Sequence, residues 1–125
     1  MNLDHQVNPT KEQFKALFSL PQDQPLVMVN ILKYKGVDGK EAYHRYMKNV
    51  GPFLEKAQGR VLWKGNTLHT LIGDQQDQPD VLLLVEYPDI PHFARMIQDP
   101  GYQEVAKDRT MGLTYGGLLV CETSL

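Results

Sequence analysis

The chain has 125 residues, the size of one ordinary globular domain. Thirteen basic against fifteen acidic side chains leave a formal net charge of −2, which argues against binding to nucleic acid or to an anionic membrane surface. The single cysteine, Cys121, cannot form an internal disulfide and favours a reducing compartment. No apolar run is long enough to span a membrane, and residues 1–25 lack the apolar stretch of a secretion signal. We therefore expect a cytoplasmic globular protein.

Residues 1–25 are predicted to form an N-terminal helical arm. Thr10 and Gln13 have the spacing of a capping box, and Phe14, Leu17 and Phe18 then recur at helical spacing. Two prolines with polar residues between them end this segment before residue 26. The apolar face of the short helix needs a partner surface on the domain of residues 26–125.

That domain opens with a strand over residues 26–32 and continues into a helix. Asp38 is predicted to cap this helix, whose apolar stripe extends to Ala57 with a kink or restart at Gly51 and Pro52. Gly59 is the expected left-handed residue after its end.

The second half of the domain repeats the alternation of strands and helices. Residues 60–73 favour either one long strand or a strand broken at Gly65 and Asn66, and residues 81–87 give the clearest strand in the chain. Asp89 and Asp99 are predicted to cap two helical segments, the second over residues 100–109. Residues 112–122 form the last strand.

The order strand, helix, strand, strand, helix, strand predicts an α+β, ferredoxin-like fold with an antiparallel sheet. Three of the four strands are apolar at consecutive positions, which is typical of a sheet buried on both faces. Two helices cover one face, so a second copy of the chain is the simplest cover for the other, as an isologous homodimer. The alternative is that the arm and loops shield part of that face.

A series of short motifs resembles a known family. In chain order they include residues 29–32 (VNIL), 59–63 (GRVLW), 84–88 (LVEYP) and 99–102 (DPGY), with Arg109 near the end. Over residues 26–122 the chain is similar to an uncharacterised bacterial family, domain of unknown function thirteen-thirty, of the dimeric α+β barrel superfamily. The resemblance implies a ferredoxin-like protomer and a homodimer whose two sheets form a barrel.

The resemblance implies no particular reaction. The superfamily includes cofactor-independent monooxygenases, isomerases, haem-degrading enzymes and binding proteins, so the fold alone does not fix a function. Relatives often carry a histidine directly before the arginine, where this chain has Asp108. A relay through that position is therefore not expected here.

Three residues are the candidates for catalysis. Asn30 interrupts an apolar strand, so its amide either satisfies the backbone or faces a cavity. Glu86 follows five apolar residues and is a candidate general base if its carboxylate is desolvated, with exposure at the strand end as the alternative. Arg109 ends a helical segment, where it either complements the helix dipole or holds an anion.

Three further residues are candidates for the walls of a substrate pocket. Tyr46 lies on the core stripe of its helix together with Tyr43, where packing is the alternative to a functional hydroxyl. Trp63 could equally belong to the core, to the dimer interface or to an aromatic-binding wall, and Met96 is the third candidate. Four well-separated histidines give no metal-binding pattern, and no cofactor is expected.

These residues support two hypotheses of different class. In the first, a cofactor-free enzyme acts on a small aromatic or enolisable compound: Asn30 and Tyr46 orient an oxygen, Glu86 takes a proton and Arg109 stabilises the anion. In the second, a homodimeric protein binds a hydrophobic metabolite without catalysis, and Glu86 has no role.

Overall fold

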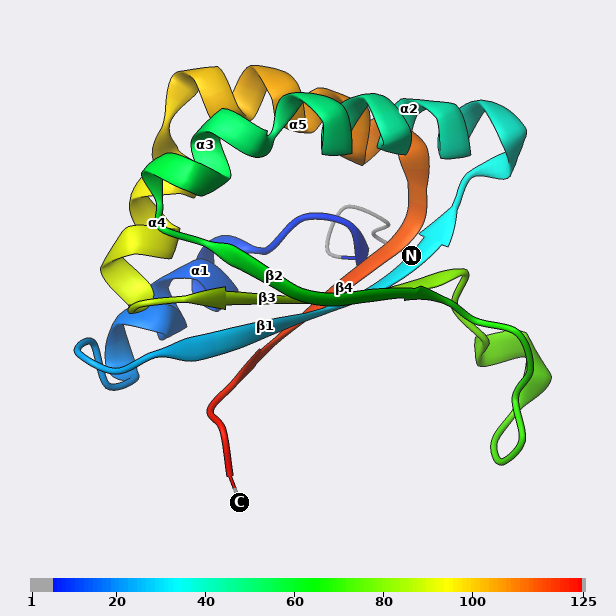
Figure 1. Cartoon of the computed structure of the whole chain (residues 1–125), viewed down its shortest axis with the longest axis horizontal. Helices are drawn as coiled ribbons and strands as arrows, with labels where there is room; N and C mark the ends of the chain where they lie inside the picture. Colours follow the sequence, from blue (N-terminus) through cyan, green and yellow to red (C-terminus); the bar gives the residue numbers. More distant parts are fainter. Residues whose placement is uncertain (1–5, 125) are drawn as a thin grey trace.

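The computed structural model describes residues 6–124 and contains one antiparallel sheet covered by helices on one face (Figure 1). The four strands are β1 (Leu26–Tyr34), β2 (Arg60–Asn66), β3 (Val81–Tyr87) and β4 (Leu113–Cys121). Their order in the sheet is β2-β3-β1-β4, with every neighbouring pair antiparallel. This is the ferredoxin-like arrangement predicted from the order of elements.

The helical layer lies on one side of this sheet. It contains α2 (Gly36–Asn49), α3 (Gly51–Lys56), α4 (Ile90–Gln98) and α5 (Pro100–Gly112). The helices α2 and α5 pack side by side above the sheet (Figure 1). The arm contributes α1 (Lys11–Ala16) and a single 3₁₀ turn, η2 (Leu17–Ser19), and Leu17 is buried in the core.

The predicted helix caps on the arm and in the second half of the chain are present. Thr10 Oγ1 accepts a hydrogen bond from the Gln13 backbone at 3.1 Å, and the Gln13 side chain accepts one from the Thr10 backbone at 2.9 Å. Asp89 caps α4, and Asp99 caps α5 by accepting from Gly101 N at 2.8 Å. Each cap satisfies a backbone N–H group that has no partner within its own helix.

Two details at the ends of the first long helix differ from the prediction. The helix α2 begins at Gly36, so Asp38 lies in its first turn and does not cap it. The left-handed residue after α3 is Gln58, with φ 57°, in place of Gly59. Gly59 is required for space, because a Cβ there would lie 2.5 Å from Leu54 Cδ1 and 3.0 Å from the Tyr87 ring. The predicted restart at Gly51 and Pro52 is confirmed.

Of the two possibilities for residues 60–73, the strand broken at Gly65 and Asn66 is closer to the structure, although residues 67–73 do not form a second strand. The strand β2 ends at Asn66, and its irregularity lies between Val61 and Trp63, where the register against β3 shifts. Gly65 continues the ladder by pairing with Leu82, and it leaves room for the Trp63 ring, because a Cβ at Gly65 would lie 2.2 Å from Trp63 Cη2. Residues 67–80 then form a connection that includes the 3₁₀ helix η3 (Gln75–Asp77).

The two faces of the sheet have different surroundings. Met28, Leu83 and Val85 point toward the helices and are buried. The opposite side, which we call the outer face, carries side chains that the register places together: Val27, Val29, Ile31, Arg60, Trp63, Leu82, Leu84 and Glu86. The apolar members are incompletely buried, and Trp63 is 53% exposed. The strands are thus apolar on both sides, as predicted.

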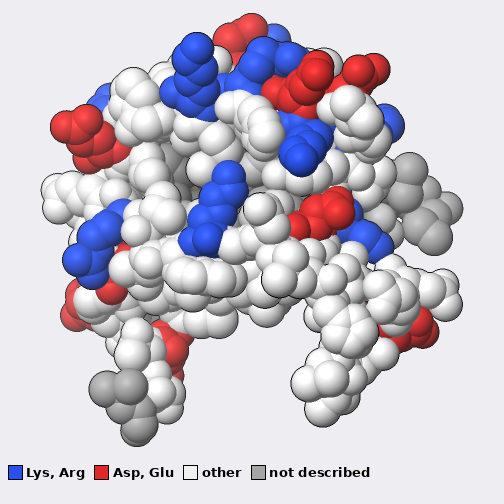
Figure 2. Space-filling model, turned by 45° about the vertical axis from the view of Figure 1, so that its right-hand side comes forward, with Lys and Arg blue, Asp and Glu red and all other residues white. Residues whose placement is uncertain are grey.

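Two segments project beyond the outer face. The β2–β3 connection and the C-terminal segment both extend away from the helices (Figure 1). The space-filling view shows a hollow between two projections on this side, with a mostly uncharged surface above it (Figure 2). The β2–β3 connection also exposes Leu68, Leu71 and Ile72 almost completely.

Candidate functional site

A cavity of about 560 Å³ lies between the sheet and the helical layer. Its walls come from β1, β3 and β4 below, from α2, α4 and α5 above, and from residues 7–17 of the arm. Asn30, Tyr46, Met96 and Arg109 all line it, so four of the six residues singled out in the sequence meet at one site. A cavity of this size can enclose a small organic molecule.

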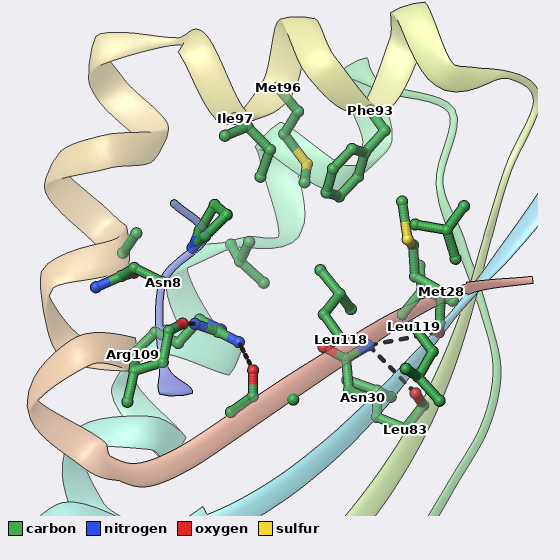
Figure 3. A pocket seen from close by; sticks show the side chains of 18 of the residues that line it. Asn8, Met28, Asn30, Leu83, Phe93, Met96, Ile97, Arg109, Leu118 and Leu119 are labelled. Carbon is green, nitrogen blue, oxygen red and sulfur yellow. Dashed lines mark hydrogen bonds between the residues drawn. The ribbon is translucent and has the colours of Figure 1, made fainter. Parts of the chain in front are cut away.

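Asn30 lies on β1 with its side chain on the helix side of the sheet. Its amide Nδ2 donates to the backbone oxygen of Leu83 at 3.2 Å and approaches that of Met28 at 3.5 Å (Figure 3). Both possibilities stated for Asn30 therefore apply. Its amide satisfies backbone carbonyls, and its side chain also lines the cavity. Its Oδ1 has no hydrogen-bond partner among the described residues and can accept one from a ligand.

Tyr46 on α2 pairs with Tyr102 on α5 across the top of the cavity. The two hydroxyl oxygens are 3.0 Å apart, and one hydroxyl must donate to the other. The accepting hydroxyl then retains a proton that it can donate to a ligand. Burial raises the pKa of Tyr46 well above its usual value, the neighbouring Tyr102 adds to this, and the positive charge of Arg109 only partly offsets it. Tyr46 therefore stays protonated, and the pair offers a hydroxyl proton to a ligand.

Arg109 extends from the last turn of α5 between the arm and β4. Its Nη1 donates to the backbone oxygen of Val7 at 2.5 Å, and its Nη2 donates to that of Gly116 at 3.1 Å (Figure 3). Gly116 makes room for the guanidinium, because a Cβ there would lie 2.9 Å from Nη2. Arg109 thus ties residue 7 of the arm to the edge of the cavity.

Apart from the Asn30 amide, the side of the cavity away from Arg109 is mostly apolar. Figure 3 shows Phe93, Met96 and Ile97 descending from α4 toward Met28 and Leu83 on the sheet. Met96 and Phe93 are buried, and Phe93 also packs edge-on against Tyr87 with ring centroids 5.1 Å apart. These side chains form an apolar surface suited to a ring or hydrocarbon group.

Glu86 and Trp63 do not line the cavity. Both lie on the outer face of the sheet, because Glu86 pairs with Arg60 and Trp63 with Leu84 in the β2–β3 register. The Glu86 carboxylate accepts from Arg60 Nη2 at 2.9 Å, and its side chain is 34% exposed. The desolvated carboxylate envisaged for a general base is therefore not found, and one pocket does not gather all six residues. The alternation of the strand explains the separation, since neighbouring residues point to opposite faces.

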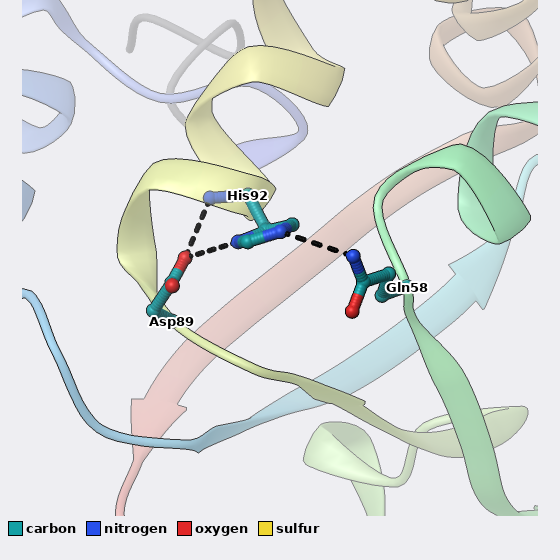
Figure 4. A network of polar contacts seen from close by, with 3 residues as sticks. All are labelled: Gln58, Asp89 and His92. Atoms are coloured by element: carbon teal, nitrogen blue, oxygen red, sulfur yellow. Dashed lines mark hydrogen bonds and ion pairs between the residues drawn. The ribbon is translucent and has the colours of Figure 1, made fainter.

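A second polar cluster lies at the start of α4, outside the cavity lining. Asp89 accepts from the backbone and from Nδ1 of His92, at 2.8 and 2.6 Å, and His92 Nε2 is 3.4 Å from the Gln58 amide (Figure 4). Partial burial would raise the pKa of Asp89, but its bonds to His92 and the nearby charges lower it overall. This cluster caps a helix and joins it to the turn after α3. Among the described residues, no three His, Cys, Asp or Glu side chains are gathered as a metal site.

Two parts of the cavity were not predicted from the sequence. The first is the hydroxyl of Tyr102, which meets Tyr46 only because α2 and α5 pack side by side. The second is residues 7–9, whose backbone reaches Arg109. The apolar face of the arm was a signal that it packs on the domain, but nothing in its sequence identified the cavity as the surface it meets.

The fold and the cavity allow this chain to be placed among known proteins. The sheet order and the one-sided helical layer define a ferredoxin-like α+β protein with a cavity between its two layers. Residues 30–123 match the model of the domain of unknown function DUF1330, and the chain belongs to that family. No match is found among curated proteins.

Several solved structures have a similar fold. A protein of unknown function from Rhodopseudomonas palustris is 31% identical, with 95% of this chain and 97% of that chain covered and a TM-score of 0.88. A dimeric protein of unknown function from Bacteroides fragilis is 7% identical, with 82% and 100% covered and a TM-score of 0.57. A cofactor-independent oxygenase from Streptomyces nogalater is 16% identical, with 82% and 97% covered and a TM-score of 0.51.

Among the helices of residues 6–124, none combines the length and the apolar character that crossing a bilayer needs.

Proposed function

We propose that this protein binds a small, largely apolar molecule in the cavity between its sheet and its helices. The observation that carries the proposal is the convergence of Asn30, Tyr46, Met96 and Arg109 on one cavity of about 560 Å³. Asn30 Oδ1 would accept a hydrogen bond from the ligand, the Tyr46–Tyr102 pair would donate one, and Met96 would contact its apolar body.

The chemistry of the lining favours binding over turnover. Among the described residues that line the cavity there is no Asp, Glu, His, Lys or Cys. The side chains that usually act as general base or nucleophile are therefore missing from the described lining. Burial raises the pKa of Tyr43 and Tyr46, so these tyrosines stay protonated, and the phenolate form that could take a proton from a substrate is not populated.

A cofactor-independent enzyme is the second candidate. Arg109 and the tyrosine pair could stabilise the anion of an enolisable or phenolic substrate, which is the role proposed for Arg109 from the sequence. One protein of similar fold is a cofactor-independent oxygenase, a likeness that is limited to the fold. Glu86, the base proposed from the sequence, would have to act from the outer face, so this candidate requires a substrate acidic enough to ionise without it.

Fluorescence of phenylnaphthylamine, a neutral dye that brightens in apolar sites, tests the proposed cavity. Ala106 lines the cavity on α5, and Ala106→Leu would fill part of it, so we expect the affinity to fall about fivefold or more. Lys107→Leu adds a leucine to the exposed side of the same helix and should leave the affinity unchanged, as should Glu86→Gln. Equal affinity in Ala106→Leu and wild type would contradict the proposal.

We also propose that two copies associate through their outer faces. The support is the row of incompletely buried apolar side chains at Val29, Leu84 and Trp63, flanked by the two projecting segments (Figures 1 and 2). A patch of this kind marks an interface in soluble proteins, and the similar fold from Bacteroides fragilis is described as dimeric. The proposed setting is the cytoplasm, where Cys121 would stay reduced.

A further inference from the structure

We infer that the ligand of the cavity carries a negative charge: the geometry points to an aromatic or alicyclic monoanion whose carboxylate, or a comparable oxyanion, lies against Arg109. This inference rests on the proposed binding function and specifies the class of molecule that is bound.

The charge of Arg109 has no acidic partner among the described residues. Arg109 is the one charged side chain among the described residues that line the cavity. None of the ion pairs between described residues includes it, and its neighbour Asp108 pairs with Arg45 on the surface at 3.3 Å. The cavity wall therefore contains a positive charge that no carboxylate of the described chain compensates.

The hydrogen bonds that Arg109 makes leave some of its donors free and go only to neutral carbonyls. A guanidinium has five N–H donors, and Arg109 uses two of its nitrogens on the neutral backbone oxygens of Val7 and Gly116. Neutral carbonyls bind a guanidinium more weakly than a carboxylate does, and a partly buried charge gains most from an ionised partner. An oxyanion in the cavity could use the remaining donors or replace the Val7 carbonyl.

The part of the cavity away from Arg109 suits the apolar body of a ligand. The side of the cavity away from Arg109 is lined by Phe93, Met96 and Met28, which offer no polar group beyond a thioether (Figure 3). A ligand that satisfies both ends has one charged group and an apolar ring system. The chain as a whole has a net charge of −2, so the attraction for an anion is local to Arg109 and not a general property of the surface.

A purely structural role for Arg109 is the competing explanation. In that case the guanidinium only ties the arm to β4, and ligands of any charge would bind alike. The two explanations differ in a measurable way, because only the first makes affinity depend on the charge of the ligand.

A matched pair of fluorescent probes separates the explanations. Anilinonaphthalene sulfonate and phenylnaphthylamine share one ring system and differ by the sulfonate. We expect wild-type protein to bind the sulfonate about tenfold or more tightly than the neutral dye, and Arg109→Gln to abolish this preference while changing the affinity for the neutral dye less than about threefold. Arg109→Lys keeps the charge and should retain part of the preference. Arg45→Gln removes an exposed arginine and should have no effect.

The possible results of these titrations separate three claims: that the dye binds in the cavity, that the ligand is negatively charged, and that the protein binds small molecules at all. If the sulfonate binds in the cavity, Ala106→Leu weakens its binding as well, and an unchanged affinity in that variant would assign the dye to the outer face and overturn the inference. Equal affinities of the two probes for wild type, or equal losses in Arg109→Gln, overturn the negative charge and leave the cavity as a binding site. Failure of both probes to bind wild type overturns the proposed function together with this inference.

Discussion

Buried tyrosines are the residues whose chemistry the cavity changes most. Burial raises the pKa of Tyr43, Tyr46 and Tyr87 above the ordinary value, and the charge of Arg109 lowers those of Tyr43 and Tyr46 by a smaller amount. In each case the folded state disfavours the phenolate relative to the unfolded chain, so these hydroxyls remain protonated hydrogen-bond donors in the native cavity.

We therefore expect the protein to lose stability in alkali. A folded-state pKa above the unfolded value contributes stability that is complete below about pH 10 and is lost as the pH rises toward the folded pKa. Phenolate absorbance at about pH 11 should show at least three of the six tyrosines un-ionised while the circular dichroism is native, and all six ionised in denaturant. Complete ionisation near pH 10 with native circular dichroism would show that these side chains are solvated.

At the level of single residues, the sequence predicted which residues line the cavity better than it predicted which way their side chains point. Asn30 stood out as a polar residue in an apolar strand, and Arg109 and Tyr46 by their positions on helices; all three line the cavity. Glu86 was proposed as a base because it follows five apolar residues, and Trp63 was left open between the core, the dimer interface and a pocket wall; the strand register places both on the outer face. The face of Glu86 follows from the alternation along β3, whereas the face of Trp63 depends on the register shift in β2, which the local pattern did not locate.

Among the elements, the packing of α2 against α5 controls the roof of the cavity. The two helices meet at Gly39 and Gly112, where a Cβ on Gly39 would lie 2.7 Å from the Gly112 oxygen and 2.8 Å from Lys35 Cβ. Gly112 also accepts the backbone hydrogen bond of Lys35 at 2.8 Å. This contact is close because both positions lack a side chain.

Gly39→Ala should therefore separate the two helices. We expect a loss of about 1–3 kcal/mol in the free energy of unfolding, since the backbone at the contact cannot move without disturbing the Lys35 hydrogen bond. Gly51→Ala is the matched control, because no heavy atom lies within 4 Å of its added Cβ, and it should be neutral or stabilising by up to about 1 kcal/mol. Urea unfolding measures both, and a neutral Gly39→Ala would show that the helix contact is loose.

Local signals predicted element starts more reliably than element lengths. Thr10, Asp89 and Asp99 each form the cap expected of them, because a cap depends on residues within three positions. The irregularity of β2 was expected at Gly65 and Asn66 but lies between Val61 and Trp63, because its place is set by the pairing with β3, which is distant in sequence. The left-handed residue after α3 is Gln58, and Gly59 is needed instead for its close approach to Leu54 and Tyr87.

For the whole molecule, the proposed association of two copies through the outer face can be tested by placing a charge there. A charge at Leu84 would lie in the middle of the proposed interface, so Leu84→Glu should sediment as a monomer where wild type sediments as a dimer. Trp63 emission should move to longer wavelength in the same variant, as its ring becomes hydrated. Val37→Glu places the same charge at an exposed position on α2 and should remain dimeric. A wild-type protein that sediments as a monomer would contradict the association.

The central claim is that a small molecule occupies the space between helices and sheet, and methyl NMR of labelled methionines tests it most directly. Met28, Met47 and Met96 line the cavity, whereas Met111 is 56% exposed and lies outside it. On titration with neutral phenylnaphthylamine we expect the three cavity methyl signals to shift together and the Met111 signal to stay in place. A titration that shifts Met111 alone, or that leaves the signals of Met28, Met47 and Met96 unmoved while the dye binds, would contradict the account.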